Sequence, residues 1–193
     1  MFFIRRPSRD TIERFLAESQ HLPMSYGPVG VVQSGECRSL DEASVVVGRG
    51  REDFERAKAA LMDWQQFDLG WVELWPRRSP TTVGAVVAVL IKHFGFWSLN
   101  GCKVAYHADG NGGSAFGYAY GTLPNHAESG EELFEVLLDP ATEDVIYRIR
   151  ATSKPQAMLT WIGQPIVRAL QARFRRDSAA AMRRAVVKRE ALF

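Results

Sequence analysis

The sequence predicts an α+β fold in which an antiparallel sheet of about six or seven strands packs against a long C-terminal helix. Residues 103–152 alternate short apolar segments with turn residues, which indicates an antiparallel meander of four strands. Further strand-like segments precede this meander. After it, apolar residues recur at helical spacing over residues 155–190. The three observations together define one domain covering residues 1–193.

Two turn clusters fix the expected pairing of the meander. Residues 109–113 contain three glycines and an asparagine, and residues 139–144 contain Asp-Pro; both compositions are typical of turns. Side chains alternate between the two faces of a strand. The expected neighbours that place large apolar residues on one face are Tyr106 with Phe116, Val104 with Tyr118, Tyr118 with Phe134, Val136 with Tyr147, and Phe134 with Ile149. The opposite face then carries His107 and a cross-strand pair of Glu135 with Arg148.

Tyrosines are frequent on the predicted inner face: Tyr106, Tyr118, Tyr120 and Tyr147. A buried phenol that lacks a hydrogen-bond partner costs about 1–3 kcal/mol, so phenylalanine is the cheaper residue for a dry core. The tyrosines therefore indicate either a cavity with a polar lining or an aromatic core whose hydroxyls reach backbone groups, each other or the rim of the core. The sequence leaves both interpretations open.

The segments before the meander carry the remaining elements. Ser8 is a suitable N-cap for a first helix, and apolar residues at spacings of three and four predict a second. The Gly48-Arg49-Gly50 turn lacks the further residues of a phosphate-binding loop, and Glu52 with Asp53 would repel an anion there. The expected helices span 9–20 and 51–65, and the expected strands span 29–34, 43–47, 70–75 and 83–91.

The C-terminal helix is basic. Ser153 is a candidate cap with Pro155 in the first turn, and Leu170 and Phe174 belong to the inner stripe. From Gln164 onward the charge is +6, whereas the preceding residues sum to −4. The helix therefore either packs its charged face back on its own acidic domain, which is the commoner case, or meets an acidic partner. Arg175 is among the residues expected to face water.

The composition is that of an ordinary globular protein, and it excludes several classes of site. Cys37 and Cys102 form no metal spacing and no disulfide framework, so we expect a cytoplasmic protein without a metal. The longest apolar run is too short for a transmembrane helix, and no signal peptide is expected. No nucleophile motif and no cofactor motif is present, so we expect no cofactor and no specific nucleic-acid partner.

Three segments resemble a known family: Tyr26-Gly27-Pro28-Val29-Gly30, Val47-Gly48-Arg49-Gly50, and Phe116-Gly117-Tyr118-Ala119-Tyr120-Gly121-Thr122-Leu123-Pro124. The chain is similar over nearly its whole length to the domain-of-unknown-function family numbered nineteen-ninety, for which no activity or catalytic residue is assigned. A second likeness concerns architecture. The order of elements resembles the helix-grip superfamily of START domains, birch-pollen allergens and polyketide cyclases, although those proteins usually begin with a strand followed by two short helices. This likeness implies a curved sheet around the last helix, with a ligand cavity between them.

The resemblance and the aromatic face lead to three functional hypotheses. The first is a module that binds a small hydrophobic or amphipathic molecule, the second an enzyme of the cyclase or hydrolase kind that uses the same cavity, and the third an interaction protein that binds an acidic partner through its basic helix. We prefer the first. His126 is a further polar candidate at the loop mouth, and the oligomeric state stays open. The expected ligand-binding residues are Trp71, Tyr106, Phe116, Tyr118, Tyr120, Phe134, Tyr147 and Trp161.

Overall fold

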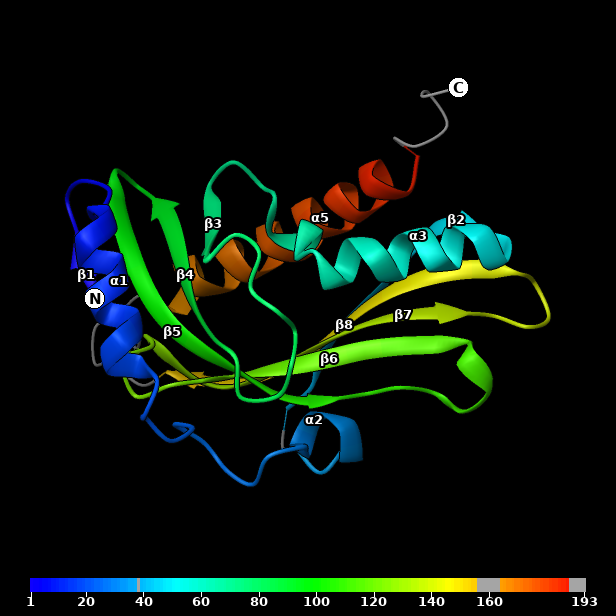
Figure 1. Cartoon of the computed structure of the whole chain (residues 1–193), viewed down its shortest axis with the longest axis horizontal. Helices are drawn as coiled ribbons and strands as arrows, with labels where there is room; N and C mark the ends of the chain where they lie inside the picture. The colour runs from blue at the N-terminus through cyan, green and yellow to red at the C-terminus, as the bar shows by residue number, and fades with distance from the viewer. Residues whose placement is uncertain (38, 156–163, 188–193) are drawn as a thin grey trace.

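A long, curved antiparallel sheet dominates the computed structural model, which describes residues 1–37, 39–155 and 164–187. Strand order is β2-β8-β7-β6-β5-β4-β3, and β1 adds to the free edge of the first part of β5. Figure 1 shows the strands curling beneath two helices, α3 and α5, that lie on the concave side. The strands are β1 Phe2–Phe3, β2 Asp41–Arg49, β3 Val72–Trp75, β4 Val86–His93, β5 Phe96–His107, β6 Ala115–Thr122, β7 Glu128–Leu138 and β8 Asp144–Pro155.

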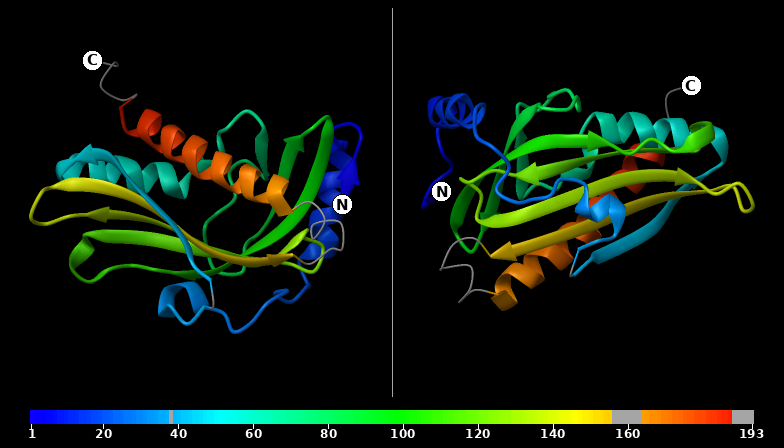
Figure 2. Two further views of the ribbon diagram at one scale, coloured as in Figure 1. Left: turned by 180° about the vertical axis from the view of Figure 1, so that it is seen from behind. Right: turned by 90° about the horizontal axis from the view of Figure 1, so that it is seen from below.

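The helices divide between the two faces of the sheet. Helices α3 (Gly50–Met62) and α5 (Gln164–Val187) and the short 3₁₀ turn η1 (Gln65–Phe67) cover the concave face. Helix α1 (Arg9–Ser19) and the single turn α2 (Val31–Ser34) lie against the convex face, as the two further views show (Figure 2). A second 3₁₀ turn, η2 (Asn111–Gly113), closes the β5–β6 hairpin. The order from β2 to α5 is therefore strand, two helical segments, six strands and helix, with about the first forty residues added in front.

The predicted registers of β6, β7 and β8 are confirmed. Tyr118 pairs with Phe134, Phe134 with Ile149, and Val136 with Tyr147. Glu135 accepts hydrogen bonds from Arg148 at 2.9 Å and also from Arg150 at 3.0 Å. Long runs of alternating residues fix a register because a slip by one residue would turn the whole apolar set toward solvent.

The predicted β5–β6 register is wrong both at Val104, whose partner is not Tyr118, and at Tyr106, whose partner is not Phe116. The pairing shifts between Val104 and Tyr106, so Val104 lies opposite Tyr120 while Tyr106 lies opposite Ala119. A bulge adds one residue to one strand and thereby reverses the faces of all residues beyond it. Tyr106 therefore points to the convex side, and His107 lies on the concave side beside Phe116.

The outer elements show both agreement and differences. Ser8 caps α1 as predicted, since its hydroxyl accepts the Thr11 N–H. The expected strand over residues 29–34 is wrong: it contains α2, which Gly30 enters with a φ of 92° that an extended strand excludes. Of the expected helix over residues 155–190, Gln164–Val187 form α5 and Pro155 instead ends β8, which pairs with β7, while residues 156–163 and 188–190 lie outside the described residues. No helix in the described residues is long and apolar enough to cross a membrane.

Candidate ligand-binding cavity

The concave face is filled at one end and hollow at the other. A cavity of about 710 Å³ lies between the sheet, residues 67–72 and the first half of α5. Strands β4, β5, β7 and β8 supply its floor, and Leu170, Gln171, Phe174 and Arg175 of α5 cover it. Its size falls in the range of about 300–1,000 Å³ that is usual for small-molecule sites.

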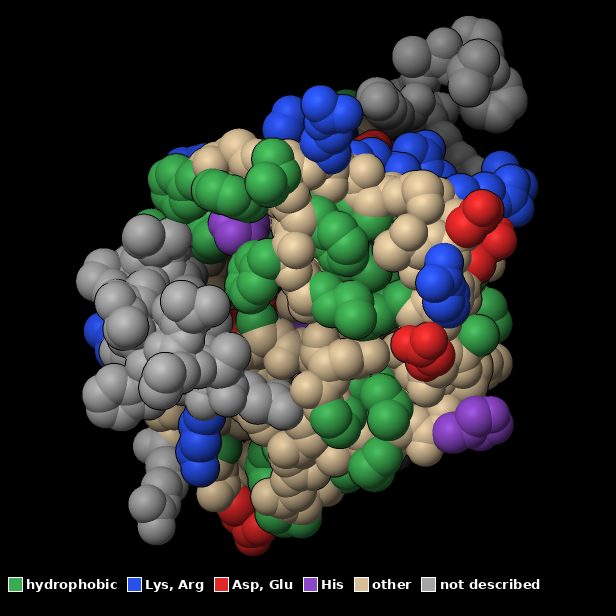
Figure 3. Space-filling view, turned by 90° about the vertical axis from the view of Figure 1, so that its left-hand side faces the viewer, with side chains coloured by type: hydrophobic (Ala, Val, Ile, Leu, Met, Phe, Trp, Pro, Cys, Tyr) green, Lys and Arg blue, Asp and Glu red, His purple; other side chains and the backbone are tan. Residues whose placement is uncertain are grey.

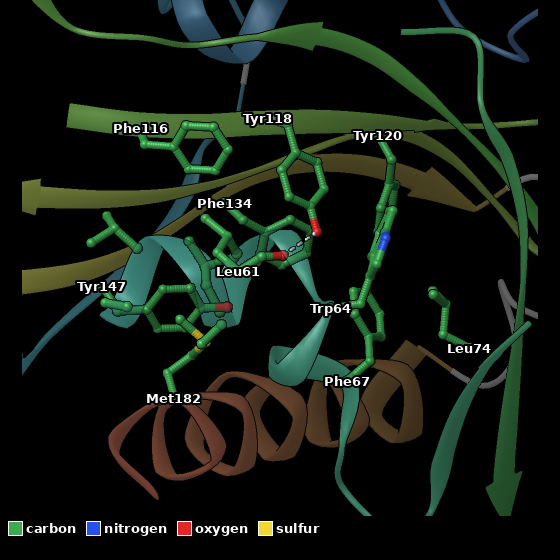
Figure 4. Packing of buried hydrophobic residues seen from close by; sticks show 14 of the residues in the cluster. Leu61, Trp64, Phe67, Leu74, Phe116, Tyr118, Tyr120, Phe134, Tyr147 and Met182 are labelled. Atoms are coloured by element: carbon green, nitrogen blue, oxygen red, sulfur yellow. Dashed lines mark hydrogen bonds between the residues drawn. The ribbon is translucent and has the colours of Figure 1, made fainter. Parts of the chain in front are cut away.

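The sequence explains why only one end is hollow. At the filled end, β6, β7 and β8 carry Phe116, Tyr118, Phe134 and Tyr147, which pack against α3 and α5 (Figure 4). At the hollow end the corresponding positions are small, and α3 does not reach them. The small residues of the cavity floor are Ser98, Gly130, Ala151 and Ser153.

Apolar and aromatic side chains make up much of the wall. Phe67 packs against Tyr120 and Phe174, with ring centroids 6.0 and 5.3 Å away. Two residues of α5 fix the Trp71 side chain: its indole N–H donates to Asp177 at 3.0 Å, and the Arg173 guanidinium lies 4.3 Å from its ring. Val72, Val89 and Ile91 complete this part of the surface. An apolar ligand body therefore finds a preformed apolar wall.

A carboxyl group and a phenol meet within the cavity. The Tyr120 hydroxyl donates to Oε2 of Glu132 at 2.7 Å. Burial raises the pKa of Glu132 to about 7, against the opposing effects of the Tyr120 hydrogen bond and of Arg175. Because Glu132 is partly ionised near neutral pH, it can act both as a hydrogen-bond donor and as an acceptor.

Three further polar side chains line the cavity: Gln171, Glu128 and His126. Gln171 donates to both carboxylate oxygens of Glu128 at 3.2 and 3.3 Å, and burial raises the pKa of Glu128. The Nδ1 of His126 lies 2.9 Å from the backbone nitrogen of Glu128 and 3.0 Å from its carbonyl oxygen, so the ring is held against this residue. Burial lowers the pKa of His126 to about 4, so this imidazole is neutral near pH 7.

The cavity opens between the β4–β5 hairpin and α5. Phe2, His93 and Phe96 line its apolar rim, and Phe2 and Phe96 are about half exposed. Figure 3 views the molecule from this side and shows hydrophobic side chains around a hollow. Arg175 lines the opposite part of the cavity and lies 4.0 Å from Asp41. The prediction that Arg175 faces water is therefore wrong, because α5 turns it toward the edge strand β2.

The structure separates the eight predicted ligand-binding residues into four groups. Trp71 and Tyr120 line the cavity. Phe116, Tyr118, Phe134 and Tyr147 belong to the closed core, because α3 and α5 fill the space above them (Figure 4). Tyr106 lies on the convex face, for the reason given by the β5 bulge. Trp161 lies outside the described residues.

Both interpretations of the tyrosines hold, each in its own half of the sheet. Tyr147 shares a hydrogen bond with Ser178 at 2.8 Å, and Tyr118 accepts from Gln66 at 2.6 Å within the core. Tyr120 reaches the cavity. Sequence reasoning missed Glu128, Glu132, Gln171 and Asn100, which all line it. Glu132 had a usable signal, since the confirmed alternation of β7 places it on the same face as Phe134 and Val136.

No group of three potential metal ligands occurs in the parts of the chain that the structure describes. Cys102 is fully buried, and burial raises the pKa of its thiol. The polar groups of the cavity are therefore suited to hydrogen bonding, to charge pairing and to proton exchange near neutral pH.

Sequence comparison now gives the family. The model of the family described as "Domain of unknown function (DUF1990)" matches residues 25–181. The chain belongs to this family. A UPF0548 protein of Dictyostelium discoideum is 33% identical over 207 residues, covering 96% of each chain. A UPF0548 protein of Deinococcus radiodurans is 34% identical over 200 residues, covering 96% of this chain and 98% of that protein.

Solved structures show the fold class of this DUF1990 protein. A Thermus thermophilus protein matches with a TM-score of 0.56 at 12% identity, covering 79% of this chain and 100% of that one. The Zhui aromatase/cyclase of Streptomyces sp. R1128 matches with a TM-score of 0.51 at 11% identity, covering 80% and 96%. The fold is helix-grip-like, with a curled sheet around a C-terminal helix. The sequence predicts that the N-terminal part differs from the usual helix-grip order of elements. In the structure β1, α1 and α2, within residues 1–40, precede the strand β2.

Proposed function

We propose that this DUF1990 protein binds a small amphipathic molecule, mostly apolar, in the cavity between the sheet and α5. One observation carries the proposal: a preformed cavity of about 710 Å³ with aromatic and aliphatic walls and a few buried polar groups at one end. Sites for small molecules have this composition, because apolar contact supplies affinity while a few polar groups orient the ligand.

The architecture supports the proposal in a second way. Helix α5 packs along the filled end through Met182 and Val186, so the cavity does not depend on closure of the whole sheet. A stable core beside an open space can hold a ligand without refolding. Preorganisation of this kind lowers the entropic cost of binding.

A fluorescence titration with N-phenyl-1-naphthylamine, a neutral apolar probe, tests the proposal. We expect saturable enhancement of probe fluorescence with the wild-type protein. The Leu170→Trp variant places a larger side chain in the cavity, and we expect it to weaken probe binding by about tenfold or more. Val187→Trp, at an exposed position of the same helix, is the matched control. Equal binding by both variants, or no binding by the wild type, contradicts the proposal.

A second candidate, an enzyme, is favoured by the Tyr120–Glu132 pair. A carboxyl group with a pKa of about 7 is suited to general acid–base chemistry near neutral pH. The test uses a molecule that co-purifies with the protein and is identified by native mass spectrometry. Conversion of that molecule by the wild type, together with binding but no conversion by Glu132→Gln, supports an enzyme. Unchanged molecule after incubation with the wild type supports binding alone.

The third hypothesis, an acidic partner of the basic helix, has less support. Several arginines of α5 already contact their own domain: Arg175 lies near Asp41, Arg183 donates to the Val46 carbonyl at 3.0 Å, and Arg184 donates to the Asp68 carbonyl at 3.5 Å. The commoner alternative, a helix packed on its own domain, accounts for these charges.

A further inference from the structure

We propose that the preferred ligand of this cavity is an amphipathic cation, in which an apolar body carries an ammonium group that pairs with Glu132 and Glu128. The inference rests on the proposed function and adds the charge of the ligand to it. Its basis is a pair of cavity carboxylates that form no ion pair within the described residues.

Neither of these two cavity carboxylates forms an ion pair within the described residues. Glu132 accepts one hydrogen bond there, from the neutral phenol of Tyr120. Glu128 accepts from neutral groups too, the amide of Gln171 at 3.2 and 3.3 Å and the hydroxyl of Ser153. By contrast, Glu135 on the same strand is paired with two arginines. The difference distinguishes the cavity side of β7 from its convex side.

Unpaired carboxylates in an apolar cavity are costly. Removing an ionised group from water is strongly unfavourable unless another charge or several hydrogen bonds replace the lost hydration. Burial raises the pKa of Glu128 and of Glu132, as expected where ionising a carboxyl group is unfavourable. A ligand cation would supply the missing counter-charge and would therefore bind more strongly than a neutral molecule of the same shape.

The charges that face the cavity from other elements leave it with an acidic excess. Among the described residues, Arg175 of α5 is the one guanidinium that lines it, and Asp41 of β2 lies 4.0 Å from that group. His126 is neutral near pH 7, and burial lowers the pKa of His93 as well. Arg175 favours the charged form of Glu132 but also lies near Asp41, so one guanidinium faces three carboxylates. The walls formed by Phe67, Trp71 and Phe174 add aromatic rings, which attract cations more than they attract neutral or anionic groups.

Three probes with one apolar body test the charge: decylammonium, decan-1-ol and decanoate, each used below its micelle concentration to displace N-phenyl-1-naphthylamine. For the wild type near pH 8 we expect decylammonium to bind about tenfold or more tightly than decanol, and decanoate to bind most weakly. Between about pH 5.5 and pH 8 the preference for the ammonium should grow, because Glu132 ionises in this range while the amine, with a pKa near 10, stays charged.

Variants on β7 and on the edge strand β2 show which carboxylate causes the preference for the ammonium probe. Glu132→Gln should reduce the ratio of decylammonium affinity to decanol affinity by about tenfold, and Glu128→Gln should reduce this ratio less. Glu42→Gln, at an exposed position of β2, is the matched control and should leave it unchanged. Equal binding of decanol and decylammonium by the wild type overturns the cationic ligand and leaves the proposed function standing. Failure of all three probes to displace bound N-phenyl-1-naphthylamine also overturns the cationic ligand, whereas failure of N-phenyl-1-naphthylamine itself to bind overturns both.

Discussion

The Tyr26 phenol donates a hydrogen bond of 2.7 Å to Glu131, a residue 105 positions later in the chain. The same carboxylate accepts from the backbone N–H groups of Gly30 and Val32, at 2.8 and 3.1 Å, and from the Tyr106 phenol at 2.6 Å. Glu131 is 2% exposed. One buried carboxylate thus fastens residues 26–32 to the convex face of the sheet, which gives a physical reason for the Tyr-Gly-Pro-Val-Gly segment.

Glu131→Gln should destabilise the protein by about 2 kcal/mol. A glutamine side chain replaces one acceptor oxygen by an NH₂ donor, which then faces donor groups, and it removes the charge that strengthens the four bonds. Urea unfolding followed by circular dichroism measures the change, with Glu42→Gln as the exposed control. A midpoint equal to that of the control would show that the carboxylate does not hold the segment.

Gly121→Ala should also destabilise the fold, by about 1–3 kcal/mol, because a Cβ at this position would overlap the Tyr26 ring. The cost should shrink in a Tyr26→Ala background, where the ring is absent. A double-mutant cycle on the free energy of unfolding measures this coupling. Additive effects of the two substitutions would contradict the close packing as the cause.

Tyr118→Phe should lower stability by about 1–3 kcal/mol and leave the affinity for N-phenyl-1-naphthylamine within about twofold. Its hydroxyl lies in the closed core, where it accepts from Gln66 at 2.6 Å and donates to the Leu61 carbonyl at 3.3 Å. Removing it leaves the Gln66 amide without this acceptor, while the Leu61 carbonyl still accepts the Trp64 N–H at 3.1 Å. Tyr120→Phe is the matched comparison, since it removes a cavity hydroxyl instead. A larger change in affinity for Tyr118→Phe than for Tyr120→Phe would contradict this placement.

Glu132 should make the protein less stable as pH rises. Its folded-state pKa of about 7 lies above the value of about 4.3 for an unfolded glutamate. The folded state therefore binds this proton more tightly, so the contribution is fully present below about pH 4.3 and is lost as pH rises through about 7.

Substitution isolates this contribution. Relative to the wild type, Glu132→Gln should gain about 1–2 kcal/mol between about pH 5 and pH 8, the partial exposure of the group reducing the full value. Chemical unfolding of both proteins across this range measures the difference. A difference between the two proteins that does not change with pH would contradict an elevated pKa at this position.

Alternation was sufficient to predict much of the sheet from sequence. Val136, Tyr147 and their neighbours carry large apolar side chains at every second position, and only one register buries them together. The same reasoning failed between β5 and β6, because alternation of apolar residues does not reveal the bulge before Tyr106, which turns the Tyr106 hydroxyl toward Glu131 on the convex face. Because tyrosine is only weakly polar, the residue type alone does not show which face of the sheet its side chain occupies.

The cavity itself was only partly predictable. Trp71 and Tyr120 were expected in its wall, but the boundary between cavity and core follows from where α3 ends, at Met62, relative to a curved sheet. Sequence gives the length of that helix and not its position above the strands. The turn at Gly48 has a clear physical explanation after the fact, since a Cβ there would lie 2.5 Å from an oxygen of Asp53, whose carboxylate accepts the Arg49 N–H at 2.7 Å.

The division of the concave face into a filled end and a hollow end also bears on how such a protein can diverge. Substitutions at Ser98 or Ala151 can reshape the space available to a guest molecule, while Tyr118, Phe134 and Tyr147 keep the scaffold folded at the other end. Selection for a new ligand and selection for persistence of the fold therefore act on different residues. Two members of the family with the same scaffold can thus acquire different chemical preferences without passing through an unstable intermediate sequence.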